Sequence, residues 1–220
     1  MISHVIFDCD GVLLDSEKIS MDVDLALLAE NGIDFTESEM HHRFVGTTFE
    51  AMIAEMEVEF GKPLPRDLGE RKDALMLERY RRDLKTVPGV VPMLQQLRLP
   101  KSIGTNGPRH RALAALRMTG LEAFFGDRLT TFEDVKHGKP APDIYQLAAF
   151  RAGFAPDKCL VVEDSVTGVT AAVAAGTHVI GFTGVAHDPV SKAKALKELG
   201  DLQVVHTMDE LASAIAALGA

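Results

Sequence analysis

The sequence predicts an α/β fold: a doubly wound core with a parallel sheet, interrupted by an inserted helical segment. From residue 87 onward, short apolar runs alternate with helical periodicity. One further apolar run stands near the N-terminus, at residues 4–7. Between about residues 15 and 86 the spacing indicates helices and no convincing strand. We therefore expect a core domain of residues 1–14 and 87–220 and an inserted helical domain of residues 15–86.

The N-terminal part of the chain supplies the first strand and the helices of the insertion. Residues 4–7 are a short apolar run that ends in acidic residues, as a buried parallel strand would. Apolar spacing predicts a helix from Ser16 to Asn31, with Gly32 just past its end. More helices are expected within residues 47–60 and 65–85.

The alternation of strands and helices begins beyond Pro88. The expected strands are residues 102–105, 129–131, 160–162, 179–182 and 204–205. Helices are expected after Pro88 and Pro108, over 141–153 and 165–176, and after Thr207. Proline is favoured at the first helical position because its missing N–H has no partner there in any case.

Composition excludes several function classes. The 220 residues carry 23 Lys and Arg against 32 Asp and Glu, a formal net charge of −9. Nucleic acids and anionic membranes are bound through basic surfaces, which this charge balance disfavours. No apolar run approaches the about 20 residues of a membrane helix, and two cysteines form no disulfide framework. We expect a cytoplasmic monomer that binds neither nucleic acid nor membranes.

Polar residues follow several of the expected strands at the point where each ends. Asp8 and Asp10 follow the first strand, Thr105 and Asn106 another, and Glu163-Asp164 a third. Ligands of open parallel sheets bind beyond these carboxyl ends. Carboxylates gathered there would resist ionising together unless a cation neutralised them, and hard oxygen ligands favour Mg²⁺.

These residues also carry a resemblance to a known family. Asp8-Cys9-Asp10-Gly11, Thr105-Asn106, residues 138–143 (Gly-Lys-Pro-Ala-Pro-Asp) and Glu163-Asp164-Ser165 resemble, in order, the four motifs of haloacid dehalogenase-like phosphatases. The insertion is similar to the helical cap of the β-phosphoglucomutase-like branch. Within that branch the chain looks closest to bacterial sugar-phosphate phosphatases such as 6-phosphogluconate phosphatases. The resemblance implies a Mg²⁺-dependent hydrolase of a small sugar or sugar-acid phosphate.

The resemblance also implies roles for the strand-end residues. Asp8 would attack phosphorus and form an aspartyl phosphate, and Asp10 would carry the proton to the leaving oxygen. Asp8, Asp164 and the backbone carbonyl of Asp10 would hold Mg²⁺, with Glu163 as a further ligand. Lys139 would hold both Asp8 and the transferring phosphoryl group.

Phosphate and substrate contacts are expected from two regions. The Thr105 hydroxyl and the backbone N–H groups after it, at Asn106 and Gly107, would bind phosphate oxygens. Arg109 would reach the phosphate or the substrate, with a solvated surface position as the alternative. In the cap, residues Gly46, Thr47 and Thr48 are candidates for facing the substrate, with ordinary helix capping as the alternative. Alternation along the strand turns Cys9 away from Asp8, which favours a packing role for Cys9.

Three other functions remain open from the residues. A receiver-like phosphoacceptor domain would also use Asp8, but has no need of an insertion of about 70 residues. A haloacid dehalogenase would use the same aspartate without a metal, and Asp10 with the Glu163-Asp164 pair argues against it. A β-phosphoglucomutase has a histidine at the place of Ser20 and an arginine at the place of Phe49, so we expect a phosphatase.

Overall fold

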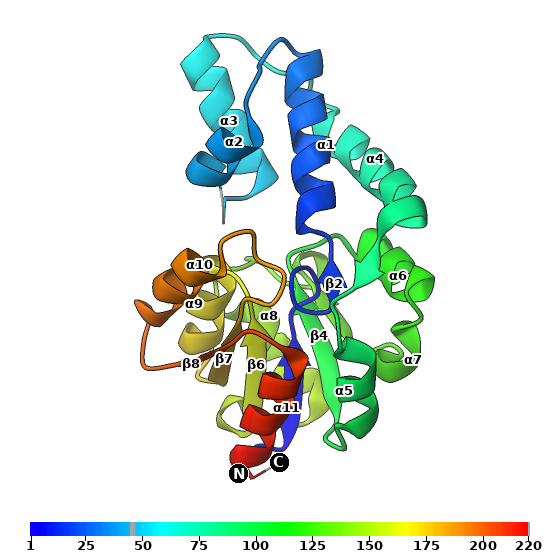
Figure 1. Cartoon of the computed structure of the whole chain (residues 1–220), viewed down its shortest axis with the longest axis vertical. Coiled ribbons are helices and arrows are strands. Elements are labelled where there is room, and N and C mark those ends of the chain that lie inside the picture. The colour runs from blue at the N-terminus through cyan, green and yellow to red at the C-terminus, as the bar shows by residue number, and fades with distance from the viewer. Residues whose placement is uncertain (45–46, 220) are drawn as a thin grey trace. The chain divides into compact units, whose positions relative to one another are not determined.

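The computed structural model describes residues 1–44 and 47–219, and their contacts divide the chain into two units. The core unit comprises Met1–Asp15 and Lys85–Ala220, and the helical unit comprises Ser16–Leu84 (Figure 1). Two short antiparallel strands, β2 (Leu14–Asp15) and β3 (Lys85–Thr86), join the two units. The boundary residues 15 and 86 expected from the sequence lie in this two-stranded ribbon, which the sequence did not predict.

The core unit is built on a parallel sheet in the order β5-β4-β1-β6-β7-β8. Every neighbouring pair in it is parallel. This confirms the predicted α/β fold class, and each expected strand is present. The strands are β1 (His4–Phe7), β4 (Lys101–Thr105), β5 (Leu129–Thr131), β6 (Cys159–Glu163), β7 (His178–Phe182) and β8 (Gln203–Val205).

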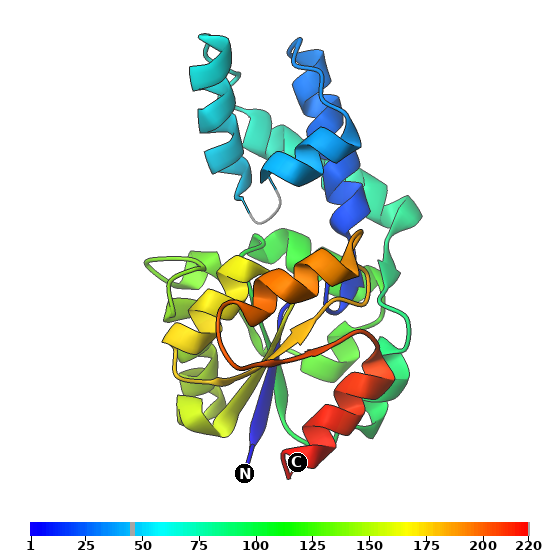
Figure 2. The same cartoon turned by 60° about the vertical axis from the view of Figure 1, so that its left-hand side comes forward.

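Helices cover both faces of this sheet. Figure 2 shows α8 and α9 on one face and α5 and α11 on the other. The helices are α5 (Val90–Gln96), α6 (Arg109–Met118), α7 (Glu122–Phe125), α8 (Asp143–Ala152), α9 (Val166–Ala174), α10 (Pro189–Lys197) and α11 (Met208–Ala217), with 3-10 turns at Phe132–Asp134 and Pro156–Lys158. The sequence reading missed α7 and α10. An N-cap at Asp188, which accepts from the backbone N–H of Ser191, starts α10.

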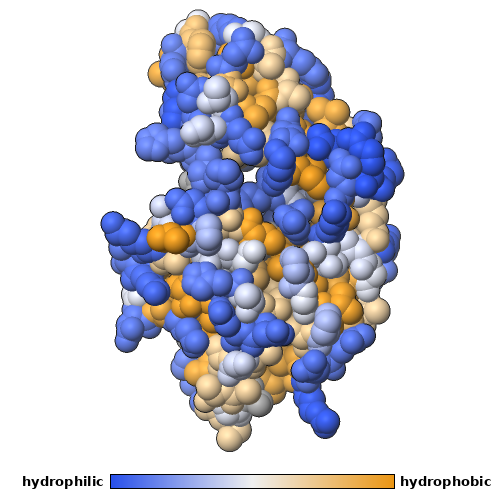
Figure 3. All heavy atoms as spheres, viewed as in Figure 1, coloured by the Kyte–Doolittle hydropathy of each residue, from blue (hydrophilic) through white to orange (hydrophobic). Residues whose placement is uncertain are grey.

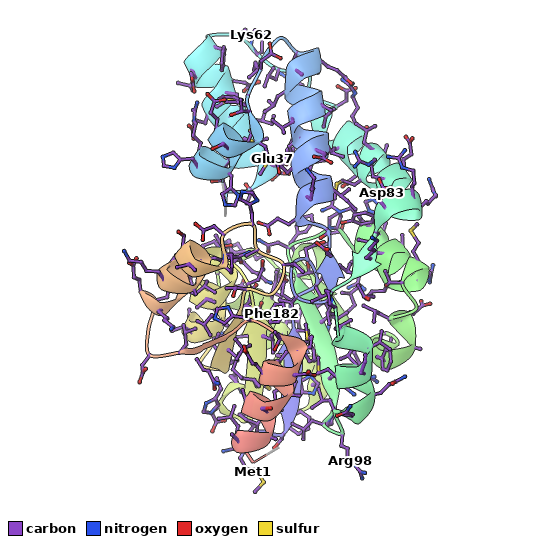
Figure 4. The ribbon with its side chains drawn as sticks, viewed as in Figure 1. Met1, Glu37, Lys62, Asp83, Arg98 and Phe182 are labelled. Atoms are coloured by element: carbon purple, nitrogen blue, oxygen red, sulfur yellow. The ribbon has the colours of Figure 1, made fainter. Side chains whose placement is uncertain are left out.

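The helical unit consists of α1 (Glu17–Glu30), α2 (Glu37–Phe44), α3 (Phe49–Phe60) and α4 (Leu68–Asp83). The helix α2 lies within residues 15–86, where the sequence indicated helices. The apolar faces of these helices bury Leu27, Met40 and Met56 almost completely. Charged side chains of this unit form ion pairs at the surface, such as Glu37 with Lys18 and Asp83 with Arg79 (Figure 4). Hydrophilic residues cover much of this unit in Figure 3. No helix of the residues described is long and apolar enough to cross a membrane.

Labelled residues mark the two ends of the sheet. Met1 and Arg98 lie near its amino-terminal end, whereas Phe182 ends a strand at the carboxyl end (Figure 4).

Cys9 is 1% exposed, and burial raises the pKa of its thiol well above the ordinary value. The predicted packing role of Cys9 is therefore confirmed.

A buried histidine makes the core sensitive to acid. His4 stacks on Phe154, with 5.5 Å between the ring centroids, and its Nε2 lies 2.7 Å from Ser102 Oγ. Burial, with the nearby charge of Arg128, lowers the pKa of His4 from 6.5 to about 4. The unfolded chain therefore binds a proton on His4 near pH 6.5, whereas the folded chain binds it only near pH 4. The free energy of unfolding therefore falls as the pH is lowered from 6.5 to 4.

We expect His4→Gln to weaken the loss of stability between pH 7 and pH 4.5, because the amide does not titrate. Urea unfolding at both pH values measures the effect. His178→Gln is the matched control, since His178 is exposed on β7 and should leave the pH dependence unchanged. An equal pH dependence in His4→Gln and the wild-type protein would contradict the assignment.

Candidate active site

The sheet order brings the expected catalytic residues to one edge. Strand β1 lies between β4 and β6, and the three strands run in the same direction. Asp8 directly follows β1, Thr105 ends β4, and Glu163 ends β6 with Asp164 next in the chain. Residues separated by more than 150 positions thus meet because parallel strands end together.

Three carboxylates lie close together at this edge. One oxygen each of Asp8, Glu163 and Asp164 lies within 4.8 Å of the others, and each residue is at most 9% exposed. Two glycines make room for them. A Cβ on Gly11 would lie 2.3 Å from Asp164 Oδ2, and a Cβ on Gly168 would lie 1.6 Å from Glu163 Oε1. A side chain at either glycine would therefore displace a carboxylate.

Lys139 links two of these carboxylates. Its Nζ lies 2.6 Å from Asp8 Oδ1 and 2.7 Å from Glu163 Oε1, and its side chain is 3% exposed. Burial favours the neutral amine, but Asp8 and Glu163 outweigh it and hold the pKa of Lys139 above the ordinary value. The ammonium is therefore charged, and it contacts both carboxylates.

The surroundings of Asp8 disfavour the charged form of its carboxyl group. Burial, together with the charges of Glu163 and Asp164, raises its pKa well above the ordinary value against the opposing effect of Lys139. A cation at this point would favour the carboxylate form. The donor set is three hard carboxylate oxygens with neither histidine nor cysteine, which fits Mg²⁺.

Hydrogen bonds hold Glu163 in place. Tyr145 donates its hydroxyl to Oε1 at 2.9 Å, and Ser165 donates its backbone N–H and hydroxyl to Oε2 at 2.8 and 3.0 Å. Burial raises the pKa of Glu163, but Lys139 and these donors together lower it below the ordinary value. Tyr145 was missed from the sequence. The Lys139 ammonium also lies 4.8 Å from the Tyr145 ring centroid.

Asn106 fixes the backbone that carries Lys139. Its Nδ2 donates to the Lys139 carbonyl at 3.1 Å, and the Lys139 backbone N–H donates to its Oδ1 at 2.8 Å. A Cβ on Gly138 would lie 2.8 Å from that Oδ1. The Asn106 side chain therefore holds the lysine loop, and the phosphate contact expected of its backbone N–H stays a prediction.

The turn after β4 carries the backbone N–H groups expected to bind phosphate, and that contact stays a prediction. The backbone N–H of Gly107 donates to Thr105 Oγ1 at 2.9 Å, within the turn itself. A Cβ on Gly107 would lie 3.6 Å from Asp10 Oδ2 and 3.8 Å from Arg111 Nη2. The side chains of Arg111, Asp10 and Thr105 therefore lie close together around Gly107. The sequence did not reveal Arg111 as a site residue.

The Arg109 side chain contacts residues outside this group, and its expected contact with the phosphate or the substrate stays a prediction. Its guanidinium pairs with Asp134 and donates to the Leu129 carbonyl at 3.2 Å. Arg151 pairs with the same aspartate at 3.1 Å. Residues two apart on a helix point about 200° apart, so only one of Arg109 and Arg111 faces the site.

The cap candidates belong to the helical unit. Gly46 lies outside the described residues. Thr48 is the N-cap of α3 and accepts from the Ala51 backbone N–H at 3.2 Å, which bears out the helix-capping alternative for this side chain. Thr47 and Thr48 are both exposed. Their contact with substrate stays a prediction.

Comparison with known proteins places this geometry in a family. A family model described as haloacid dehalogenase-like hydrolase matches residues 2–176. The chain belongs to the haloacid dehalogenase-like hydrolases. The Agrobacterium tumefaciens haloacid dehalogenase-like protein has a similar crystal structure, with a TM-score of 0.88, 38% identity and 100% of both chains covered.

Two curated relatives of this haloacid dehalogenase-like hydrolase are named as phosphatases. The phosphorylated carbohydrates phosphatase of Thermotoga maritima is 34% identical, over 91% of this chain and 93% of its own length. The 6-phosphogluconate phosphatase of Escherichia coli is 28% identical over 85% of each chain. The predicted family is confirmed, and the enzyme is a phosphatase, a phosphoric monoester hydrolase.

Proposed function

We propose that the protein hydrolyses the phosphate ester of a small sugar or sugar acid, with Mg²⁺ and through an aspartyl phosphate on Asp8. The observation that carries this proposal is the buried Asp8 carboxylate, which Lys139 contacts at 2.6 Å beside two further carboxylates. This arrangement supplies a nucleophile together with positive charge for the phosphoryl group.

In the first step an Asp8 oxygen forms a bond to phosphorus, and the bond from phosphorus to the sugar oxygen breaks. Asp10 gives a proton to that leaving oxygen. In the second step Asp10 takes a proton from water, the water oxygen bonds to phosphorus, and the acyl phosphate bond breaks to restore Asp8. Lys139 stabilises negative charge on the transferring group, and the Thr105 hydroxyl donates a hydrogen bond to it.

Asp8, Asp164 and the backbone carbonyl of Asp10 would hold Mg²⁺, with Glu163 as a further ligand. When bound, the ion would neutralise the repulsion between an anionic nucleophile and an anionic phosphoryl group. We expect EDTA to reduce phosphate release from an arylphosphate to the background rate and added Mg²⁺ to restore it. Turnover that persists in metal-free protein would instead favour a dehalogenase-like mechanism.

The substrate is proposed to be a small phosphorylated metabolite. The two relatives named for phosphorylated carbohydrates and for 6-phosphogluconate support this class. A core that supplies only phosphoryl chemistry cannot distinguish leaving groups, so specificity is assigned to the helical cap. Replacing Thr47 and Thr48 with other residues should change the order of hydrolysis rates across a panel of sugar phosphates more than it changes the rate with an arylphosphate. A cytoplasmic, monomeric state stays a prediction.

Mutase activity is the second candidate, and the cap residues argue against it. Serine at position 20 cannot replace an imidazole, and Phe49 offers no bidentate contact to phosphate. The Phe49 ring instead lies 4.4 Å from the Lys72 ammonium. Phosphorus NMR of β-glucose 1-phosphate primed with the 1,6-bisphosphate tests this. Glucose 6-phosphate formed without matching free phosphate would favour the mutase.

Arg111 is proposed as a phosphate or substrate ligand in place of Arg109. Arg111→Met should lower kcat/KM about 10- to 100-fold, because a charge-assisted hydrogen bond contributes about 1.5–3 kcal/mol. Arg109→Met is the matched control on the same helix. It should lower the melting temperature through its contact with Asp134 and leave kcat/KM nearly unchanged. Equal kcat/KM losses in the two variants would contradict this division of roles.

A further inference from the structure

A second lysine reaches the carboxylate cluster from α10. Lys192 Nζ lies 2.6 Å from Asp164 Oδ2, and the two side chains are 16% and 13% exposed. Lys192 lies in the first turn of this helix, whose start is fixed by Pro189 and the Asp188 cap. The contact spans 28 positions in the chain, and no family motif quoted above includes Lys192.

The two lysines divide the cluster between them. Lys139 contacts Asp8 and Glu163, and Lys192 contacts Asp164. Asp164 Oδ2 is also the atom nearest to the missing Cβ of Gly11, so the Lys192 contact lies next to the loop that follows the nucleophile. Without a divalent ion, the cluster of three carboxylates is thus partly neutralised from within the chain.

We propose that Lys192 is an internal counter-cation of the metal site, which neutralises Asp164 in the metal-free enzyme and lowers its affinity for Mg²⁺. This inference rests on the proposed Mg²⁺ site. An ammonium and a divalent ion on one carboxylate are roughly 5 Å apart, and even a water-like dielectric makes their repulsion worth about tenfold in affinity. Lys192 is mostly buried, so screening by solvent does not remove the effect.

An orienting role for Lys192 predicts the opposite result. Hydrogen bonds to metal-ligating carboxylates commonly strengthen metal binding, and their loss weakens it by about 10- to 100-fold. A cationic donor differs from a neutral one because it competes with the metal for the same negative charge. The sign of the change in Mg²⁺ affinity therefore separates the two roles.

Calorimetric titration of Mg²⁺ into the metal-free, full-length protein decides the sign. Lys192→Met should bind Mg²⁺ about tenfold more tightly than the wild-type protein. Its melting temperature should fall without metal and rise more on Mg²⁺ addition, because Asp164 loses its counter-ion. Lys194→Met removes the same charge from an exposed position on α10 and should stay within twofold of the wild-type affinity. Lys192→Arg keeps the charge and should bind Mg²⁺ as weakly as the wild-type protein does.

Equal or weaker Mg²⁺ binding by Lys192→Met overturns this inference and leaves the proposed function standing. If Lys192→Met does not fold without metal, the uncharged Lys192→Gln is held to the same criterion. A wild-type protein that binds no Mg²⁺ overturns the proposed metal-dependent function as well, so the two failures are distinguishable.

Discussion

Asp8→Asn should lower phosphate release by at least about 10⁴-fold, because an amide oxygen is too weak a nucleophile to form the acyl phosphate. The fold should survive. Burial and two neighbouring carboxylates raise the pKa of Asp8, so replacing the carboxylate with a neutral amide removes repulsion from the metal-free site. The Lys139 ammonium keeps its contact with Glu163. We therefore expect a melting temperature equal to or above that of the metal-free wild-type protein.

Steady-state release of phosphate from an arylphosphate measures the first expectation, and a thermal melt with EDTA measures the second. Asp201→Asn is the matched control, since Asp201 is exposed and lies far along the chain from the carboxylate cluster. It should retain wild-type activity. Asp8→Asn with full activity would remove Asp8 as the nucleophile, and a lowered melting temperature would contradict the electrostatic account of the site.

Lys139→Met should lower activity by roughly 10³-fold and also destabilise the protein. Charge stabilisation of the transferring group is lost. Removing one partner of a buried ion pair commonly costs about 3–5 kcal/mol, because the other partner stays buried without compensation. Here Asp8 and Glu163 would face each other without Lys139, and their pKa values would rise in the folded state. Without Mg²⁺, the variant should therefore lose stability relative to the wild-type protein as pH rises from 5 to 8.

Urea unfolding at the two pH values, with and without Mg²⁺, checks this second prediction. Lys136→Met removes the same charge from an exposed position in the segment before Lys139 and should change neither activity nor the pH dependence. A pH dependence of stability in Lys139→Met equal to that of the wild-type protein would mean that Asp8 and Glu163 do not depend on Lys139 for their charge.

Part of the site was predictable because strand ends are local features. Apolar runs identified β1, β4 and β6, and the residues at or directly after their ends, Asp8, Thr105 and Glu163, lie at one edge of the sheet. The motif around Lys139 predicted a lysine beside the nucleophile, and Lys139 contacts Asp8 across 131 positions. Since parallel strands share a direction, the list of strand ends already gave most of the carboxylate cluster.

Other contacts depend on which way a helix faces once it packs. Arg109 and Arg111 have the same chemistry two positions apart, and the seating of α6 turns Arg109 to Asp134 and Arg111 toward Asp10. Tyr145 looks like any core aromatic in the sequence, yet its hydroxyl reaches Glu163. The contact between Lys192 and Asp164 required α10, a helix that the apolar spacing did not reveal.

The sequence by itself determined the succession of the sheet strands along the chain, the inserted helical segment and the acidic strand ends, because backbone propensity and apolar periodicity act over a few neighbouring residues. Only the tertiary structure decided which charged groups pair. Asn106 clamps the Lys139 loop, Gly11 and Gly168 leave room for carboxylates, and Lys192 neutralises Asp164. These contacts depend on distances of a few ångströms between segments remote in the chain, and packing of the whole core sets such distances.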